Sequence, residues 1–338
     1  MAKRRINDQQ QRRIKSIQQK RREKAADNQQ EKSDTLSQQG LGPEQSGLVI
    51  TNYGRAQIVE DKEKKLHRCV ARRNLGTLVC GDQVIWQPAL ADNNEGVVVA
   101  VEERQSLLQK PGFGGKLKPM AANIDQIIIV SAVQPDPKPY LIDRYLIAAE
   151  NLPATPIILI NKIDLLEEKN KDSIRKLVKD YQNIGYKVIT SSKVTDCGFD
   201  DLLETLQSHT SIFVGLSGVG KSSLINHLMP ELNIRVGELS AASGEGTHTT
   251  TSSTLYTLPC GGVLIDSPGV RDFGLWNSTA EDILHGFIEL RKYIGHCKFS
   301  NCSHQHEPGC AIQQALKDGD ISQMRFNSYL KTIEEYTN

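Results

Sequence analysis

The sequence predicts an α/β core domain, preceded by a small β-barrel and followed by a mostly helical segment that binds a metal. Between residues 113 and 276, apolar runs such as IDQIIIVSAV alternate with helical stretches, which is typical of a mostly parallel sheet covered on both faces. Residues 46–112 contain short β-branched runs separated by Gly, Asp and Asn, which favours an OB-fold barrel. Residues 277–338 are helical in pattern and are interrupted by a Cys/His cluster.

The length and composition exclude several classes of protein. A chain of 338 residues with 38% hydrophobic and 24% charged residues predicts two or three globular domains. No apolar stretch approaches the roughly 18 residues that a membrane span needs, and the first residues lack the apolar region of a secretory signal. Seven cysteines, an odd number, do not indicate a disulfide framework. We therefore expect a cytoplasmic protein without membrane contacts.

Charge is distributed unevenly along the chain. The net charge is +1, but residues 1–32 hold eleven Lys/Arg and only four Asp/Glu. Residues 1–45 carry too few large apolar side chains to offset the entropy lost on ordering, so they are predicted to form a basic disordered tail. Two interpretations stay open: a solvated extension, or an arm that docks on nucleic acid.

The predicted barrel also has features of an RNA-binding domain. Tyr53 and Trp86 could offer stacking faces, although a Trp within a strand is more often a core residue. The basic run is more often a solvated turn, but the neighbouring basic tail favours RNA. The basic residues on or beside the barrel are Arg55, Lys62, Lys64, Lys65, Arg68, Arg72 and Arg73.

The strongest motif is GLSGVGKS at residues 215–222, which fits G-x-x-x-x-G-K-[ST] between an apolar strand and a helix. Glycines let the backbone wrap phosphates, and the helix N-terminus adds its positive dipole end. Lys221 is expected to reach the β- and γ-phosphates, and Ser222 to bind Mg²⁺. The nucleotide contacts predicted here are Gly215, Leu216, Ser217, Gly218, Val219, Gly220, Lys221, Ser222 and Ser223.

A second motif, Asn161-Lys162-Ile163-Asp164, follows the strand TPIILI and suits guanine. The Asp164 carboxylate can accept hydrogen bonds from the guanine N1–H and 2-amino group, a pattern that adenine does not present. This argues against an ATPase. The segment containing Ser191 and Ser192 also follows a strand, and we expect it to pack against the base.

A third group of residues is predicted to sense the γ-phosphate. Asp266-Ser-Pro-Gly269 fits D-x-x-G, with Asp266 near Mg²⁺ and the Gly269 N–H near the γ-phosphate. One threonine in the segment GTHTTT (246–251) should complete the Mg²⁺ coordination, and we assign Thr250. The sequence does not decide among these threonines.

The order of these motifs indicates a circular permutation. In an ordinary small GTPase the phosphate motifs come first and the base motifs last, whereas here residues 161–164 precede residues 215–222 and 266–269. The same sheet can still form, because the ends of such folds lie near one another at the surface. The segment after Asp266 then leads directly into the C-terminal region, so nucleotide state could pass to it.

With these motifs in this order, residues 46–338 resemble the circularly permuted, small-subunit-dependent GTPases of the RsgA (YjeQ) family. The resemblance implies an OB-fold, a GTPase domain and a zinc domain in a cytoplasmic bacterial protein. It also implies GTP hydrolysis stimulated by the small ribosomal subunit and a role in late subunit maturation. Thr247 stands where many members have a basic or amide residue.

Hydrolysis needs a group that positions water. Ras-like enzymes have Gln after D-x-x-G, but the corresponding residue here is Val270, which cannot hydrogen-bond water. Intrinsic hydrolysis is therefore expected to be slow. We assign His248 as the catalytic residue; the alternative is that it contacts RNA or lies in a mobile loop.

The Cys/His cluster offers three thiolates and an imidazole. Such a set suits one tetrahedral, structural Zn²⁺, and four protein ligands leave no open position for catalysis. His296 and His306 compete as ligands; the family resemblance favours His304. The predicted ligands are Cys297, Cys302, His304 and Cys310.

These patterns leave three functions open. The first is a GTPase that binds the small ribosomal subunit and its rRNA and leaves upon hydrolysis. The second is a GTPase acting on another RNA or ribonucleoprotein. The third is a nucleotide-sensing RNA-binding scaffold with little turnover. Nothing in the sequence demands a dimer, so we expect a monomer.

Overall fold

The computed structural model describes residues 40–90, 95–111, 117–231, 253–267 and 278–337. These ranges include the predicted barrel, both halves of the α/β sheet and the C-terminal helices. Most of the predicted basic tail lies outside them. Within the described residues, no helix combines the length and the apolar character that crossing a bilayer requires.

The N-terminal strands close into a five-stranded barrel. Their order is β1-β2-β3-β5-β4, and β4 pairs again with β1. Strands β3 and β5 run parallel while the other barrel pairs are antiparallel. The barrel prediction is confirmed. The strands are β1 (Gln45–Asn52), β2 (Ala56–Glu60), β3 (Leu66–Ala71), β4 (Gln83–Gln87) and β5 (Gly96–Val101).

The barrel interior is filled by a hydrophobic core around one tryptophan. Trp86 is fully buried and packs with Val49, Val59 and Val98, all of them fully buried. Gly47 is needed beside it, because a Cβ there would lie 2.7 Å from the indole Nε1. Trp86 is therefore a core residue and does not offer a stacking face.

A short hairpin joins the barrel to the α/β domain. Its strands β6 (Leu107–Pro111) and β7 (Leu117–Ala122) pair antiparallel. The amide of Asn123 donates to the Gly81 carbonyl of the barrel at 2.8 Å, and the Ser106 hydroxyl donates to the Ile124 carbonyl at 2.6 Å. The predicted boundary at 112/113 falls inside this hairpin.

The second part of the sheet has the order β10-β9-β8-β11-β13-β12. All its pairs are parallel except β12 with β13. The expected mostly parallel sheet is confirmed, and every residue of β8 is buried, as its continuous apolar run predicts. The strands are β8 (Gln126–Ala132), β9 (Thr155–Asn161), β10 (Lys187–Ser191), β11 (Thr210–Val214), β12 (Thr254–Thr257) and β13 (Val263–Asp266).

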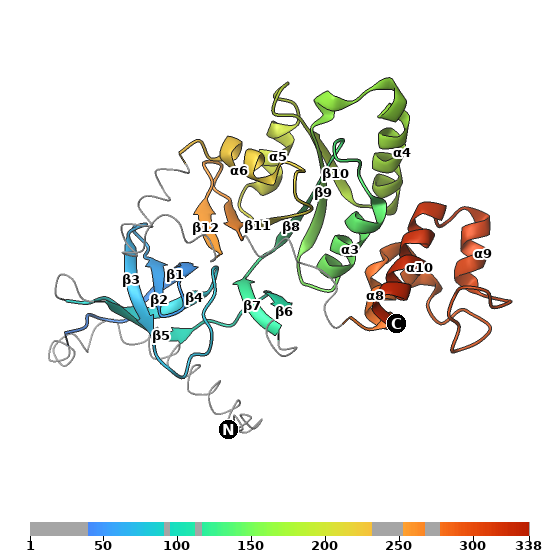
Figure 1. The fold of residues 1–338 in the computed structure, drawn as a ribbon. Helices are drawn as coiled ribbons and strands as arrows, with labels where there is room; N and C mark the ends of the chain where they lie inside the picture. The colour runs from blue at the N-terminus through green and yellow to red at the C-terminus, as the bar shows by residue number, and fades with distance from the viewer. Residues whose placement is uncertain (1–39, 91–94, 112–116, 232–252, 268–277, 338) are drawn as a thin grey trace.

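The two parts of the sheet are hydrogen-bonded to each other. Strand β12 pairs antiparallel with β1, with Thr51 opposite Thr254. One wall of the barrel thus continues the edge of the α/β sheet. Figure 1 shows the barrel and the C-terminal helices at opposite ends of the molecule. The helices are α3 (Pro139–Glu150), α4 (Glu168–Ile184), α5 (Phe199–Leu206), α6 (Lys221–Leu228), α8 (Ala280–Gly286), α9 (Ala311–Asp318) and α10 (Gln323–Thr337), with short 3-10 turns η3 (Ile163–Leu165) and η5 (Ile288–Tyr293).

A buried ionic cluster fastens the C-terminal helices to the α/β domain. The fully buried Arg325 guanidinium of α10 donates to Asp143 of α3 at 2.6 Å and to both oxygens of Glu289 at 2.6 and 2.9 Å. The Tyr181 hydroxyl also donates to Asp143, and the Phe287 ring lies 4.4 Å from the guanidinium carbon. Burial raises the pKa of Asp143 while Arg325 opposes that rise. No sequence pattern predicted this cluster.

Replacing Arg325 tests how strongly this cluster holds the domains together. Arg325→Met should lower the free energy of unfolding by about 3–5 kcal/mol, because Asp143 and Glu289 would lose their buried counter-charge. Urea denaturation measures the change. Arg175→Met, on the exposed surface of α4, is the control and should change stability by less than about 0.5 kcal/mol. Equal effects of both substitutions would contradict the prediction.

Candidate nucleotide-binding and metal-binding sites

The predicted nucleotide motifs follow parallel strands that end at one edge of the sheet. The register places Ala132 of β8 and Ser191 of β10 on either side of Asn161 of β9. On the other side of β8, β11 pairs in parallel with both β8 and β13. Ligands of open α/β sheets bind outside the carboxyl ends of such strands. The permuted motifs therefore converge despite their order in the chain.

The phosphate loop needs its glycines for steric reasons. Gly215 has a φ of +138°, and a Cβ there would lie 2.1 Å from the Val130 carbonyl oxygen. Gly220 has a φ of +101° and directly precedes α6. The Lys221 ammonium donates to the Gly215 carbonyl at 2.7 Å and to the Leu216 carbonyl at 2.6 Å. Its charge thus lies over the loop at the N-terminus of a helix, an arrangement that binds anions.

The loop leaves polar groups accessible next to this lysine. Leu216, Ser217 and Gly218 are exposed, as are Ser222 and Ser223 in the first turn of α6. Val219 is different, because its side chain is buried in the core beneath the loop. A buried residue in the middle anchors the loop while its neighbours stay open to a ligand.

The base motif contacts the phosphate loop directly. The Asn161 amide donates to the Val219 carbonyl at 3.0 Å across 58 residues of sequence. The Lys162 ammonium donates to the Gly218 carbonyl at 2.6 Å and to the Gln134 carbonyl at 2.9 Å. Lys162 adopts a left-handed φ of +60°, which turns the chain into η3. These contacts join the two predicted halves of one nucleotide site.

The serine segment holds the Asp164 carboxylate that is predicted to read the base. The Ser192 hydroxyl donates to Asp164 at 2.5 Å and accepts from the Val194 and Thr195 amides. The buried Ser191 hydroxyl donates to the Asn161 side chain at 3.2 Å. Asp164 itself stays exposed, and Ile163 beside it is half-buried. The sequence predicts that both serines pack against the base. No sequence pattern predicted the hydrogen bond by which Ser192 orients Asp164.

The expected γ-phosphate contacts are only partly described. Asp266 ends β13, beside β11 and its phosphate loop. The neighbouring Ser253 and Ser267 hydroxyls share a 2.7 Å hydrogen bond that the sequence analysis did not foresee. Three predicted residues lie outside the described ranges, namely His248, Thr250 and Gly269.

The four predicted metal ligands form one cluster. The candidate ligand atoms of Cys297, Cys302, His304 and Cys310 all lie within 4.8 Å of one another. The His304 Nδ1 is 3.5 Å from the Cys297 sulfur and 3.4 Å from the Cys310 sulfur. His296 and His306, the competing candidates, are not part of the cluster. Three thiols and one imidazole at this spacing fit a closed tetrahedral metal site.

Hydrogen bonds from the protein shape the loop between the ligands. The Glu307 carboxylate accepts from the Ser303 amide and hydroxyl at 2.8 and 2.6 Å, and from the Gln305 and His306 amides at 3.1 Å. These bonds lower the pKa of Glu307 to about 2. The Cys310 sulfur caps α9 by accepting from the Gln313 amide. The loop is therefore held in a shape that brings the ligands together.

Two glycines of the phosphate loop provide a matched test of its packing. Ala at position 220 would place a Cβ 2.4 Å from the Asn161 amide nitrogen, whereas Ala at position 218 would meet nothing within 4 Å. Both positions have a positive φ, so both carry backbone strain. Gly220→Ala should therefore destabilise by about 1–3 kcal/mol more than Gly218→Ala, because it also breaks the buried Asn161 hydrogen bond. Denaturant unfolding measures both variants, and equal losses would contradict this packing.

Comparisons with known proteins agree with this arrangement. A family model described as RsgA GTPase matches residues 101–276. The chain is 49% identical over 341 residues to the small ribosomal subunit biogenesis GTPase RsgA of Chromohalobacter salexigens, with 100% of this chain and 99% of the relative covered. It is 46% identical over 338 residues to the protein of that name from Hahella chejuensis, with 99% and 97% covered.

Solved structures support the fold independently. The circularly permuted GTPase YloQ is similar with a TM-score of 0.70 and 30% identity, covering 87% of this chain and 95% of the other. YjeQ from Thermotoga maritima is similar with a TM-score of 0.72 and 31% identity, covering 87% and 99%. Both similarities confirm the permuted topology that the motif order predicted. The barrel, the permuted sheet and this likeness along nearly the whole chain show that the protein belongs to the RsgA GTPase family.

Proposed function

We propose that this protein binds the small ribosomal subunit, assists its late maturation in the cytoplasm and couples subunit-stimulated GTP hydrolysis to its release. The observation that carries the proposal is the direct contact between the base motif and the phosphate loop, on a sheet that continues into the barrel. Relatives covering nearly the whole chain are named small ribosomal subunit biogenesis GTPases. GTP, GDP and rRNA are the implied partners, and we expect the protein to act as a monomer.

The site residues divide the recognition of GTP between base and phosphates. Asp164, oriented by Ser192, accepts from the guanine N1–H and 2-amino group, and Asn161 addresses the N7/O6 edge. The Lys162 stem covers the ring. Backbone N–H groups of residues 215–223 and the Lys221 ammonium hold the phosphates.

The residues present also fit a magnesium ion bound with GTP. Ser222 lies in the first turn of α6 and Asp266 at the end of the neighbouring strand, and both offer the oxygen ligands that Mg²⁺ prefers. We propose that these residues and Thr250 hold the ion, which would neutralise charge on the phosphates. The Gly269 N–H would sense the γ-phosphate.

The hydrolytic step depends on a positioned water molecule. Val270 replaces the glutamine that orients this water in Ras-like enzymes, so the chain alone should hydrolyse GTP slowly. We propose that His248 positions this water in the complex with the subunit. RNA contacts by the barrel and by residues 1–45 would supply that binding.

The C-terminal cluster is proposed to hold one structural zinc ion. All four ligands come from the protein, so no coordination position remains for a substrate. Zinc would supply folding energy to a loop that has few apolar residues of its own.

Phosphate release from GTP and ATP, with and without purified ribosomal subunits, tests the proposed function. GTP hydrolysis should be slow alone and at least about 100-fold faster with small subunits, while ATP should not be hydrolysed. Equal stimulation by large subunits would favour another ribonucleoprotein partner. No stimulation by either would favour a nucleotide-sensing scaffold.

The base assignment can be tested by changing one acceptor into a donor. Asp164→Asn should weaken GTP binding by about 10–100-fold, because one charged hydrogen bond is lost. It should improve binding of xanthosine triphosphate, whose 2-oxo group accepts from the new amide. Titrations with both nucleotides measure this change in binding preference. Asp172→Asn on the exposed face of α4 is the control. Unchanged nucleotide preference would overturn the assignment.

The metal assignment predicts about one zinc ion per chain, measured by elemental analysis of purified protein. Cys302→Ser should lose most of this zinc, because one thiolate ligand is removed. Cys197→Ser, which changes an exposed thiol elsewhere, should keep it. Full zinc content in Cys302→Ser would contradict the assigned ligand set.

A further inference from the structure

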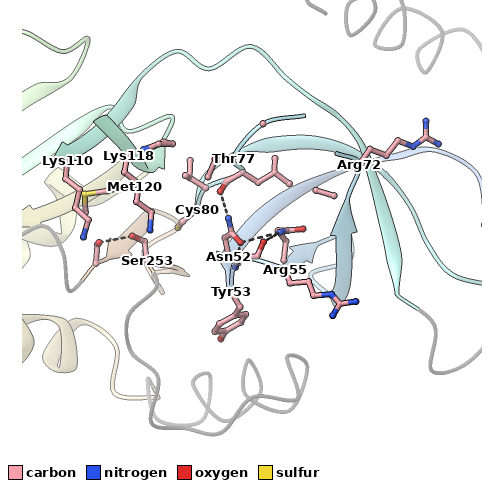
Figure 2. Close-up of a pocket in the computed structure, with 18 of the residues that line it drawn as sticks. Asn52, Tyr53, Arg55, Arg72, Thr77, Cys80, Lys110, Lys118, Met120 and Ser253 are labelled. Carbon is pink, nitrogen blue, oxygen red and sulfur yellow. Dashed lines mark hydrogen bonds between the residues drawn. The ribbon is translucent and has the colours of Figure 1, made fainter. Parts of the chain in front are cut away.

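A cleft of about 640 Å³ lies where the barrel, the β6–β7 hairpin and the ends of β12 and β13 meet. Figure 2 shows Lys110 and Lys118 of the hairpin on the same side of the cleft as Ser253, with Arg55 and Arg72 at the barrel side. Its volume is within the range of binding sites for small ligands or short chain segments. None of the proposed GTP or zinc contacts within the described residues lines it.

The cleft has a strongly positive lining. Arg55, Arg72, Arg73, Lys110 and Lys118 line it, and among the described residues no Asp or Glu does. Within the described part of the chain, none of these five cations forms an ion pair, whereas Lys64, Lys65 and Arg68 on the same barrel each bind a glutamate. Concentrated and uncompensated positive charge in a concave surface attracts an anionic ligand.

The spacing of these cations favours an extended anion. The lysines lie at the hairpin side and the arginines at the barrel side, so the charge extends along the cleft instead of converging on one point (Figure 2). A chain of phosphodiesters can contact both sides, whereas one compact phosphate group contacts only one. The basic groups therefore match a nucleic-acid backbone better than a free phosphate.

One buried polar group beneath the cleft lacks a hydrogen-bond donor among the described residues. Gln57 lines the cleft and is only 2% exposed. Its amide nitrogen donates to Asn52 and to the Gly54 carbonyl, but its Oε1 has no partner among the described residues. A buried acceptor without a donor costs about 1–3 kcal/mol. Because this oxygen has almost no exposed surface, it does not select among ligands of the cleft.

The cleft also contains a surface on which a base can stack. Tyr53 lines it, half-buried, with its ring packed on the core. A base in a duplex is already stacked and paired, so only an unpaired nucleotide can use such a ring. Together with the cations, this ring favours single-stranded RNA.

The cleft reaches the two strand ends that flank the γ-phosphate contacts. Ser253 and Ser267 line it and are hydrogen-bonded to each other at 2.7 Å. Ser267 follows the proposed Mg²⁺ ligand Asp266, and Thr254 is the register partner of Asp266 across β12 and β13. A phosphate oxygen that accepts from these hydroxyls would compete with their mutual bond. Occupancy of the cleft and the state of the nucleotide site thus act on the same strand ends.

We propose that this cleft binds a single-stranded RNA segment and that its occupancy stimulates GTP hydrolysis through Ser253 and Ser267. The inference rests on the proposed function in one respect, since the RNA that fills the cleft belongs to the ribosomal subunit. It goes further by assigning the hairpin lysines as RNA ligands and the serine pair as the link to the nucleotide site.

Direct binding by the full-length protein tests the ligand. A fluorescent ten-nucleotide oligouridylate is titrated with wild-type protein and with Lys110→Gln/Lys118→Gln at several salt concentrations. The variant should bind at least 10-fold more weakly, and its salt slope should fall by about 1.4, the contribution of two phosphate contacts. Lys176→Gln/Lys179→Gln on the exposed face of α4 removes the same charge elsewhere and should bind like wild type. An unchanged affinity and salt slope in the hairpin variant would overturn the proposal.

Competition identifies the chemical class of the ligand. Unlabelled oligouridylate should displace the probe, whereas inorganic tripolyphosphate at the same phosphate concentration should displace it at least 10-fold less well. Equal displacement would show that the cleft takes any polyanion, and the RNA assignment would then be wrong. A ten-base-pair RNA duplex should compete poorly, and tight competition by the duplex would refute the single-strand assignment.

Stimulation of hydrolysis tests the link. Ser253→Ala keeps all five cations, so it should bind oligouridylate within about 3-fold of wild type, yet its hydrolysis with small subunits should fall at least 10-fold. GTP affinity, measured in the same preparation, reports whether the variant is folded. Full stimulation in Ser253→Ala would overturn the link. If small subunits do not stimulate wild type, the proposed function fails, while the oligouridylate titration still decides whether the cleft binds RNA.

Discussion

The whole nucleotide site depends on the parallel pairing of β8 with β9 on one side and β11 on the other. The base motif follows β9 and the phosphate loop follows β11, so β8 alone separates them within the sheet. Parallel strands end at the same edge, and side chains beyond them meet there whatever their order in the chain. The Asn161–Val219 hydrogen bond closes this arrangement. Permutation changes only where the chain enters and leaves it.

The same sheet also connects the nucleotide site to the barrel. Strand β1 of the barrel pairs with β12, and β12 pairs in turn with β13, which ends at Asp266. The barrel wall and the α/β sheet are therefore continuous. The hairpin adds a second attachment through Asn123 and Ser106. Only β12 and β13 therefore lie between a ligand bound at the barrel junction and Asp266, the predicted Mg²⁺ ligand. This short path is the physical basis on which we propose that RNA binding is coupled to hydrolysis.

At the end of the molecule away from the barrel, the buried cluster of Arg325, Asp143 and Glu289 holds the C-terminal helices against the α/β domain. Arg325 pairs with both Asp143 and Glu289 and lies against aromatic rings, so removing Arg325 leaves two carboxylates without their counter-charge. Docking on α3 gives the C-terminal helices a defined position relative to the sheet. The cluster of Cys297, Cys302, His304 and Cys310 then lies in a loop whose own side chains bury little apolar surface.

The sequence alone determined the fold class and the permutation and predicted the candidate nucleotide and metal residues, because glycine spacing, apolar runs and Cys/His spacing are local patterns. It also left Trp86 open between core and RNA surface, and only the closed barrel decided for the core. The tertiary structure alone revealed the Arg325 cluster, the Ser192–Asp164 bond and the cationic cleft. Each joins residues far apart in the chain through contacts that no periodicity encodes, since charge pairing and burial depend on which surfaces meet after folding.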